Sequence, residues 1–262
     1  MLSDVYPPQV SGGAKHVQSL SHNLTNRGHQ VIIGTTALRG GSRHTEDNVS
    51  KLYELSGFFP RISFLYQGQD RFPAPVQDWL LNIELRRIIE KERPDIVHAH
   101  GWILQSIIPA LEYISIPLVV TLHDYRAVCP AAGMVEKATT CDMHISRNCL
   151  VCCRRIYGSG VLGTAKSLAV YLATKRNKRK LNSVTKFIAV SSYIKQVHLQ
   201  AVGLQYEDVI VIPNFYAKVK YDEQKVNTKL PGDFILFVGR LVPEKGVGIL
   251  IDAYRRLNTE AD

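Results

Sequence analysis

A histidine, an aspartate and a tyrosine follow directly on a short apolar run in the middle of the chain. The run, Leu118–Leu122, is rich in β-branched residues and has the pattern of a strand that is covered on both faces. His123, Asp124 and Tyr125 come immediately after it. Ligands of open α/β sheets bind outside the carboxyl ends of the strands, so titratable side chains at such an end are where chemistry is expected. We therefore expect these three residues to line a functional site.

Two more histidines end an earlier apolar run at residues 95–100. They are His98 and His100, and they would lie at the same edge of a parallel sheet as His123. Either histidine could instead be structural and bond to neighbouring carbonyl groups. We expect His98 to point to the side of the strand opposite to His100, which makes a structural role an equal alternative for it.

A glycine pair, Gly12 and Gly13, stands in the loop before a helix predicted at residues 14–27. A loop that enters a helix N-terminus presents backbone N–H groups and the positive end of the helix dipole, which suits a phosphate. Glycine pairs more often simply form turns, so the pair alone is a weak signal.

The five cysteines all lie between residues 129 and 153. Such a cluster indicates either disulfides or a metal site, and the metal is favoured if the protein works in the cytosol, where thiols stay reduced. Cys149 and Cys152 have the C-x2-C spacing of tetrahedral zinc sites, and Cys129 and Cys141 complete four ligands. Cys153 is left out because it is adjacent to Cys152. The zinc is expected to be structural, since four thiolates leave no open position for a substrate.

Predicted strands and helices alternate along most of the chain, which indicates a doubly wound, parallel, Rossmann-like α/β sheet. The predicted strands lie at 30–36, 51–55, 62–66, 95–100, 118–122, 186–190 and 209–212, and the main predicted helices at 14–27, 76–92, 102–115, 161–182 and 193–201.

A polar connector at 216–232 separates this first domain, residues 1–215, from a second region at 233–262. That region begins with an apolar run at 234–238, predicted to be a buried strand, and continues with an amphipathic helix. One strand and one helix cannot bury a core of their own. We therefore expect 233–262 to be the truncated start of a second Rossmann-like domain, less well packed than the first.

The composition places limits on the partners. The chain has 262 residues, 45% of them apolar, and a formal charge of +9, which favours anionic partners. No apolar run approaches the roughly 18–20 residues that would span a bilayer. Much of the positive charge lies between Arg147 and Lys180. This stretch is either a solvated face or a contact with anionic lipid headgroups. Nucleic acid is not expected as a partner, because the basic stretch has no recognition motif and no interleaved aromatic residues.

Six segments, in this order, resemble glycosyltransferase family 4, whose members have the two-domain GT-B architecture. They are YPPQVSGGAKHVQSLSHNLTNRGHQV, PDIVHAHGW, PLVVTLHDY, AVSSYIKQV, VIVIPNF and ILFVGRLVPEKGVGILIDAYRRL. The resemblance implies transfer of a sugar, with retention of configuration, from a UDP- or GDP-linked donor to a glycan or lipid-linked acceptor. It implies a role in cell-surface polysaccharide or glycoconjugate synthesis, in the cytoplasm or peripherally on the inner face of the membrane.

The resemblance also implies roles for single residues. Gly12 and Gly13 would lie under the donor diphosphate, and His123 would face the transferred sugar as the catalytic residue. Arg240 and Lys245 match a basic pair that clamps the diphosphate, where two fixed cations offset the charge that builds up on the leaving group. No metal or other cofactor is needed for that step.

The remaining implied roles concern the acceptor and the hinge. His98, His100, Asp124 and Tyr125 are acceptor-side candidates, and Asn214 would lie at the hinge between the domains.

The family's paired glutamates, E-x7-E, and its nucleoside pocket would lie beyond residue 262. We therefore expect the chain by itself to be inactive, as an acceptor-side domain with a fragment of the donor side. A non-catalytic module that binds nucleotides or sugar phosphates is the alternative. A dinucleotide oxidoreductase is excluded, because no G-x-G-x-x-G follows the first strand.

Overall fold

The computed structural model describes residues 1–9, 11–36, 43–46, 51–58, 76–130, 135–136, 139–141, 148–158, 160–215, 234–239, 241 and 245–259. The chain divides into two compact units, Met1–Ala217 and Lys218–Asp262.

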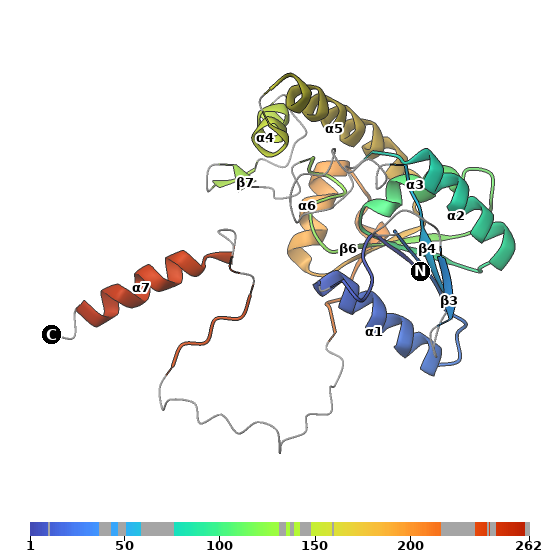
Figure 1. Cartoon of the computed structure of the whole chain (residues 1–262), viewed down its shortest axis with the longest axis horizontal. Coiled ribbons are helices and arrows are strands. Elements are labelled where there is room, and N and C mark those ends of the chain that lie inside the picture. The colour runs from blue at the N-terminus through green and yellow to red at the C-terminus, as the bar shows by residue number, and fades with distance from the viewer. Residues whose placement is uncertain are drawn as a thin grey trace, which may run out of the picture. The chain divides into compact units, whose positions relative to one another are not determined.

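An eight-stranded sheet forms the centre of the first unit (Figure 1). Its order is β10-β9-β6-β5-β1-β2-β4-β3, and among these described strands only β3 is antiparallel to its neighbour. The strands are β1 (Leu2–Ser3), β2 (Ile32–Thr36), β3 (Arg43–Glu46), β4 (Lys51–Leu55), β5 (Val97–His100), β6 (Leu118–Leu122), β9 (Lys186–Ala189) and β10 (Val209–Val211). The predicted parallel α/β architecture is confirmed.

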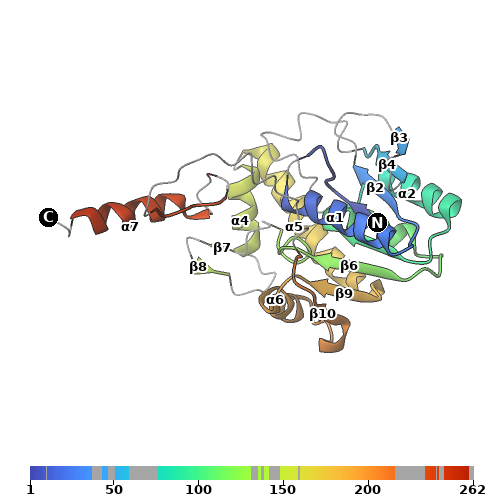
Figure 2. The ribbon, with the colours of Figure 1, turned by 90° about the horizontal axis from the view of Figure 1, so that it is seen from below.

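Helices connect these strands. They are α1 (Gly12–Asn26), α2 (Trp79–Glu92), α3 (Leu104–Ala110), α4 (Asn148–Tyr157), α5 (Val161–Lys180) and α6 (Ser192–Val202), with short 3-10 turns η3 (Gly101–Ile103), η4 (Leu181–Ser183) and η5 (Tyr206–Asp208). A small hairpin, β7 (Val135–Glu136) and β8 (Thr139–Thr140), stands apart from the main sheet (Figure 2).

Helices cover both faces of the sheet. Successive residues of a strand point to opposite faces, and β2 shows this directly. Ile33 belongs to a small apolar cluster with Val17 of α1, whereas Ile32 packs against a larger cluster. That larger cluster takes Leu85 from α2 and Ile107 from α3. Therefore α1 lies on one face and α2 and α3 lie on the other.

The winding direction reverses at β1. This strand pairs with β2 on one side and with β5 on the other. The chain runs outward from β1 to β2 and β4, and then returns to β5 and continues the other way. Ser3 is opposite His100 in this pairing, so Asp4 and Gly101, which follow the two strands, are neighbours. Ligands of doubly wound sheets bind at this reversal point.

The structure changes several predicted boundaries. The helix expected at 76–92 begins at Trp79, after its cap Asp78, and the helix expected to reach residue 115 ends at Ala110. Sequence periodicity did not reveal α4, because cysteines and arginines obscure its pattern. The strand expected at 62–66 lies outside the described residues.

In the second unit, the prediction of a buried strand at 234–238 is wrong. These residues are not in a strand, and the side chain of Val238 is 82% exposed. A strand is stable only with partners for its backbone N–H and C=O groups, and no described segment of this unit supplies them. The helix that follows, α7 (Val247–Thr259), is present, but its Ile249 and Leu257 side chains are exposed.

None of the helices in the described part of the chain is both long enough and apolar enough to cross a membrane.

The first prediction concerns the cap of α6. Ser191 Oγ accepts the N–H of Ile194 at 3.2 Å, so Ser191→Ala should lower the free energy of unfolding by about 1 kcal/mol. Urea denaturation measures this. Ser192→Ala is the matched control, because Ser192 is exposed in the first turn; equal losses in the two variants would contradict the assignment of Ser191 as the cap.

Candidate active site

The carboxylate of Asp4 joins the two strands that flank the reversal point. Asp4 is buried, and its two oxygens accept the N–H groups of Trp102 and Ile103, the latter at 2.6 Å. Gly101 has a left-handed backbone with φ of 81°, and a Cβ there would collide with the carboxylate. Burial raises the pKa of Asp4 to about 6, while the two hydrogen bonds and the charge of Arg126 act in the opposite direction.

Four histidines gather at this edge. His16 comes from α1, His98 and His100 from β5, and His123 from the end of β6. His100 Nδ1 lies 3.0 Å from His123 Nε2. The ring centroid of His16 lies 4.9 Å from that of His123, in an edge-on arrangement. The structure therefore brings together His98, His100 and His123, as predicted for the end of a parallel sheet.

The prediction that His98 points away from His100 is wrong. Residues two apart in a strand share a face, and the two ring centroids are 4.3 Å apart. His98 Nε2 lies 2.7 Å from Thr121 Oγ1 on β6. This contact between neighbouring strands is consistent with a structural role for His98.

Burial favours the neutral form of these imidazoles. It lowers the pKa of His98 to about 3 and that of His123 to about 4, and protonation of His16 and the charge of Arg126 would lower the pKa of His123 further. Burial also lowers the pKa of His16, and it lowers that of His100 well below its usual value. A neutral imidazole offers one N–H donor and one acceptor nitrogen.

Two buried ring nitrogens of this histidine group have no hydrogen-bond partner among the described residues, His16 Nδ1 and His100 Nε2. The ligand atoms of His16, His100 and His123 all lie within 4.8 Å of one another. This group can therefore hydrogen-bond a bound polar molecule, and it is also the described set whose geometry could hold a metal ion.

Asp124 and Tyr125 have defined partners next to this group. Asp124 accepts the backbone N–H of Arg126 at 2.9 Å and forms an ion pair with its side chain at 3.0 Å. The Arg126 guanidinium lies 5.5 Å from the centre of the Trp102 ring. Tyr125 meets the ring of Tyr193 edge-on. These contacts fix the segment after β6 against η3 and α6.

The glycine loop ends in a capped helix. Ser11 Oγ accepts the N–H of Ala14 at 3.0 Å, and the helix begins at Gly12. Among the described residues, nothing lies within 4 Å of the position that a Cβ would take at Gly12. The first turn therefore has open space beside it for a ligand, and phosphate binding there stays a prediction.

The other predicted site residues are Lys245, Arg240 and Asn214. Lys245 lies in the second unit just before α7, and its side chain is exposed, whereas Arg240 lies outside the described residues. Asn214 belongs to the first unit. The predicted clamp and hinge therefore stay predictions.

All five cysteines are described, and each is a thiol without a disulfide. Cys129, Cys141, Cys149 and Cys152 do not form a group with metal-ligand spacing in the described structure. Cys153 is fully buried, and its pKa is raised to about 12 by burial and by the nearby Cys149, Cys129 and Cys152. Cys153, which was left out of the four expected ligands, therefore lies near three of them. The zinc site stays a prediction.

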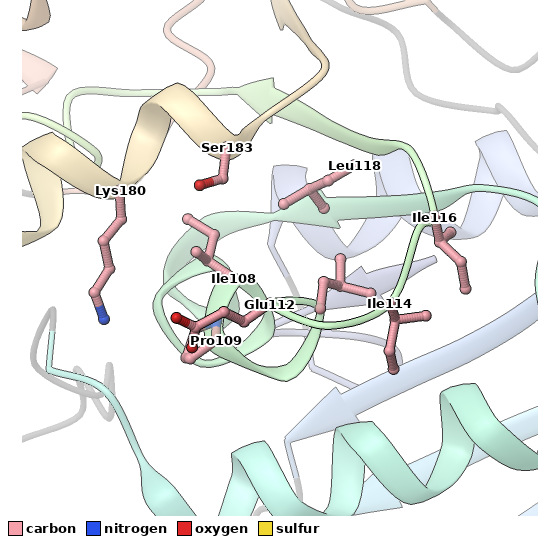
Figure 3. A pocket seen from close by; sticks show the side chains of 9 residues that line it. Ile108, Pro109, Glu112, Ile114, Ile116, Leu118, Lys180 and Ser183 are labelled. Carbon is pink, nitrogen blue, oxygen red and sulfur yellow. The ribbon is translucent and has the colours of Figure 1, made fainter.

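A pocket of about 290 Å³ lies at the opposite, amino-terminal end of β6 (Figure 3). Apolar side chains from α3 and from the start of β6 and the segment before it line this pocket, among them Ile108, Ile116 and Leu118. Its charged lining residues are Glu112 and Lys180. The histidine group lies at the carboxyl ends of the strands, so this pocket at the amino-terminal end of β6 is separate from it.

Comparison with known proteins identifies the family. The sequence model of glycosyltransferase family 4 matches residues 10–217. The chain belongs to glycosyltransferase family 4. This family 4 chain is 26% identical, over 255 residues, to an uncharacterized 42.6 kDa protein in the cps region of Klebsiella pneumoniae, with 92% of the chain and 60% of that protein covered.

Two further relatives have functional names. A glycogen synthase of Mycobacterium tuberculosis is 25% identical, with 98% of this chain and 57% of that protein covered. The gpi3 subunit of phosphatidylinositol N-acetylglucosaminyltransferase from Schizosaccharomyces pombe is 26% identical, with 98% and 47% covered. The chain thus spans about half the length of these relatives. A glycosyltransferase structure from Rickettsia africae aligns over 81% of this chain and 42% of that one, at 17% identity and a TM-score of 0.40.

Sequence reasoning missed two residues of this candidate site, His16 and Asp4. His16 stands one turn after the glycine pair, and Asp4 directly follows the strand before it. Their positions at a strand end and in the first turns of the next helix were the available signal. Periodicity drew attention to the apolar residues of α1 instead.

The histidine group predicts a pH effect on stability. When folding lowers the pKa of a histidine, the unfolded chain binds a proton at a pH where the folded protein does not. The folded state therefore loses stability as the pH falls below the pKa that the histidine has in the unfolded chain. A drop from about pH 7.5 to about pH 5.5 should therefore cost about 1.4 kcal/mol through His100 alone. The free energy of unfolding, measured by urea denaturation at both pH values, should therefore fall less between them in His100→Gln than in the wild type.

Asp4 acts in the opposite direction, because its raised pKa makes stability fall as pH rises towards about 6. It is present in both proteins, so it cancels in the comparison. His29→Gln is the control, since His29 is exposed on the turn after α1. A pH dependence of His100→Gln that equals that of the wild type would show that His100 is protonated in the folded state.

The cysteine cluster predicts a structural zinc. Protein purified without chelator should contain about one zinc ion per chain, which the Cys149→Ser, Cys152→Ser double variant should lose. Metal analysis by mass spectrometry measures this. Cys141→Ser and Cys153→Ser then identify the fourth ligand. Metal-free wild-type protein with all thiols titratable would exclude the site.

Proposed function

We propose that the chain is the acceptor-side part of a retaining glycosyltransferase that moves a sugar from a UDP- or GDP-linked donor to a glycan or lipid-linked acceptor. Membership of family 4 supports sugar transfer in general. The names of two relatives support the acceptor classes, since one is a glycogen synthase and the other acts on phosphatidylinositol. The proposal includes cell-surface polysaccharide or glycoconjugate synthesis, in the cytoplasm and at the inner face of the membrane.

The observation on which the proposal rests is the position of His123 at the carboxyl end of β6, in contact with His100 and in surroundings that lower its pKa. Cleavage of a glycosidic bond passes through a transition state in which the sugar ring becomes positively charged. A protonated imidazole beside that ring would oppose the charge. The lowered pKa of His123, about 4, removes this conflict at neutral pH and leaves an uncharged ring that can hydrogen-bond a sugar hydroxyl.

His100 gives His123 a fixed orientation. Its Nδ1 lies 3.0 Å from His123 Nε2, and His100 is itself buried in β5. The other nitrogen of His123, Nδ1, is then the atom available to the sugar. Orientation of one reacting partner before binding lowers the entropic part of the barrier.

The leaving nucleotide requires positive charge elsewhere. The N-terminus of α1 at Gly12 and Gly13 would supply backbone N–H groups and its dipole to the diphosphate. Arg240 and Lys245 of the second unit would supply two cations, so that the step needs no metal. This division of tasks leaves the first unit to hold the sugar and the acceptor.

Substitution of His123 tests the proposal. In the full-length protein, His123→Ala should reduce turnover with a UDP- or GDP-sugar by roughly 100- to 10,000-fold, because one positioned side chain typically contributes that much. Product formation, and the anomeric configuration of the product by NMR, are the measurements. Residues 1–262 alone are expected to transfer no sugar.

His29→Ala is the control for the substitution, since His29 is an exposed histidine of the same unit. Near wild-type turnover of His123→Ala would reduce His123 to a structural residue. Inversion of configuration would contradict the retaining mechanism, and binding of nucleotide sugars without any turnover would favour the non-catalytic module.

A further inference from the structure

The outer face of α5 has an unusual distribution of side chains. The residues that this helix buries against the protein are mainly small and polar, Ser167, Thr174 and Asn177 together with Val170. Ser167 and Thr174 donate their hydroxyls to carbonyls of the helix itself, at 2.7 and 2.9 Å. The leucines, in contrast, point outward, which is the reverse of an ordinary surface helix.

The exposed residues form one continuous stripe, which we call the α5 stripe. Its members recur at the three- and four-residue spacing of one helix face, and they are Val161, Leu162, Ala165, Leu168, Ala169, Leu172, Lys175, Arg176 and Arg179. The stripe is apolar over its first three turns and basic over its last two. Val161 is 92% exposed and Leu162 is 65% exposed.

The turn between α4 and α5 extends the apolar part. No charged residue occurs between Arg155 and Lys166, and Ile156 in this interval is exposed. The turn is tight, because a side chain at Gly163 would collide with the backbone carbonyl of Gly158. α4 packs along α5 (Figures 1 and 2), and Tyr157 Oη donates to the carbonyl of Pro130 at 3.3 Å. The hairpin is therefore a defined element with an uncharged tip.

The charge around this surface has one sign. No acidic residue occurs between Asp142 and Glu207. Arg154 and Arg155 flank the tip on α4, and Lys175, Arg176 and Arg179 follow it on α5, all of them exposed. An apolar tip surrounded by cations and free of carboxylates is complementary to an anionic lipid surface, where apolar side chains enter the acyl boundary and cations meet the phosphates.

We propose that the α4–α5 hairpin binds the surface of an anionic bilayer, with the α5 stripe and the uncharged tip as the contact. The apolar part of the stripe covers about 17 Å of helix, since residues rise by about 1.5 Å each. This is long enough for shallow insertion to about 5–10 Å, and far too short to span the bilayer. The purpose of this contact rests on the proposed function, because it would bring the candidate site to a lipid-linked acceptor.

Vesicle flotation with the full-length protein tests the contact. The wild type should bind phosphatidylcholine vesicles that contain about one-third phosphatidylglycerol, and not vesicles of phosphatidylcholine alone, and high salt should weaken the binding. Lys175→Gln, Arg176→Gln, Arg179→Gln should lower affinity by roughly 100-fold, and Leu162→Gln, Leu168→Gln should lower it by at least about tenfold.

Matched controls change the same residue types on other surfaces. Arg27→Gln, Arg87→Gln, Arg93→Gln removes three exposed cations, and Ile83→Gln, Ile96→Gln removes two exposed apolar side chains. Both control variants should bind as the wild type does. Absence of binding to the anionic vesicles, or equal losses in the stripe and control variants, would overturn the proposal.

Other occupants of the α5 stripe give different results. A lipid-free dimer that Leu162→Gln, Leu168→Gln dissociates would indicate a second copy, and protection of the Leu162 and Leu168 side chains from hydroxyl-radical labelling without vesicles would indicate coverage by another part of the protein. Either result overturns the proposal. Hydrolysis of a nucleotide sugar without acceptor separates this inference from the proposed function. Stripe variants should retain any such hydrolysis that the wild type shows, whereas vesicle binding without transfer to any glycan or lipid-linked acceptor would refute the transferase and leave the lipid contact intact.

Discussion

The site depends on one buried carboxylate. Asp4 accepts two backbone N–H groups from the first turn after β5, and this holds together the two strands at which the sheet changes direction. A buried carboxyl group is costly unless its oxygens are hydrogen-bonded, and here both are. Because β1 has only two residues in the sheet, its ladder alone provides few hydrogen bonds. The Asp4 contacts reinforce that short pairing at the edge where the histidines lie.

The neutral histidines follow from the same arrangement. His100 is placed by its pairing opposite Ser3, and it in turn orients His123. Burial of several imidazoles side by side disfavours the charged form of each, since every proton added would lie close to another ring. The site is therefore a group of uncharged donors and acceptors in the middle of a basic protein. Much of the positive charge lies elsewhere, between Arg147 and Lys180, which includes the α4–α5 hairpin.

Much of the first unit could be predicted from the sequence, because its strands are short apolar runs and its helices have caps and periodic apolar faces. The strand at Leu118–Leu122 and the helix beginning at Val161 have the predicted starting points. Position at a strand end was enough to select His100 and His123.

The failures have physical reasons as well. His16 and Asp4 enter the site through contacts between segments far apart in the chain, which no local pattern records. The run at 234–238 has the composition of a strand, but strand formation requires a partner, and composition says nothing about whether one is present. The prediction placed His98 on the wrong face because it misapplied the two-residue period of a strand. The close, tilted contact between the His98 and His100 rings corrects it.

The central position of β1 has a consequence for how the protein folds. Its partner on one side, β5, pairs Leu2 with Ala99, so the middle of the sheet joins segments that are distant in the chain. Pairings of this kind are slow to form, because a long loop must close before any contact stabilises it. During synthesis the ribosome adds about 5–20 residues per second. Several seconds therefore pass between the synthesis of β1 and that of β5, with which it pairs. In that interval β1 and the apolar side of β2 have no finished sheet to join.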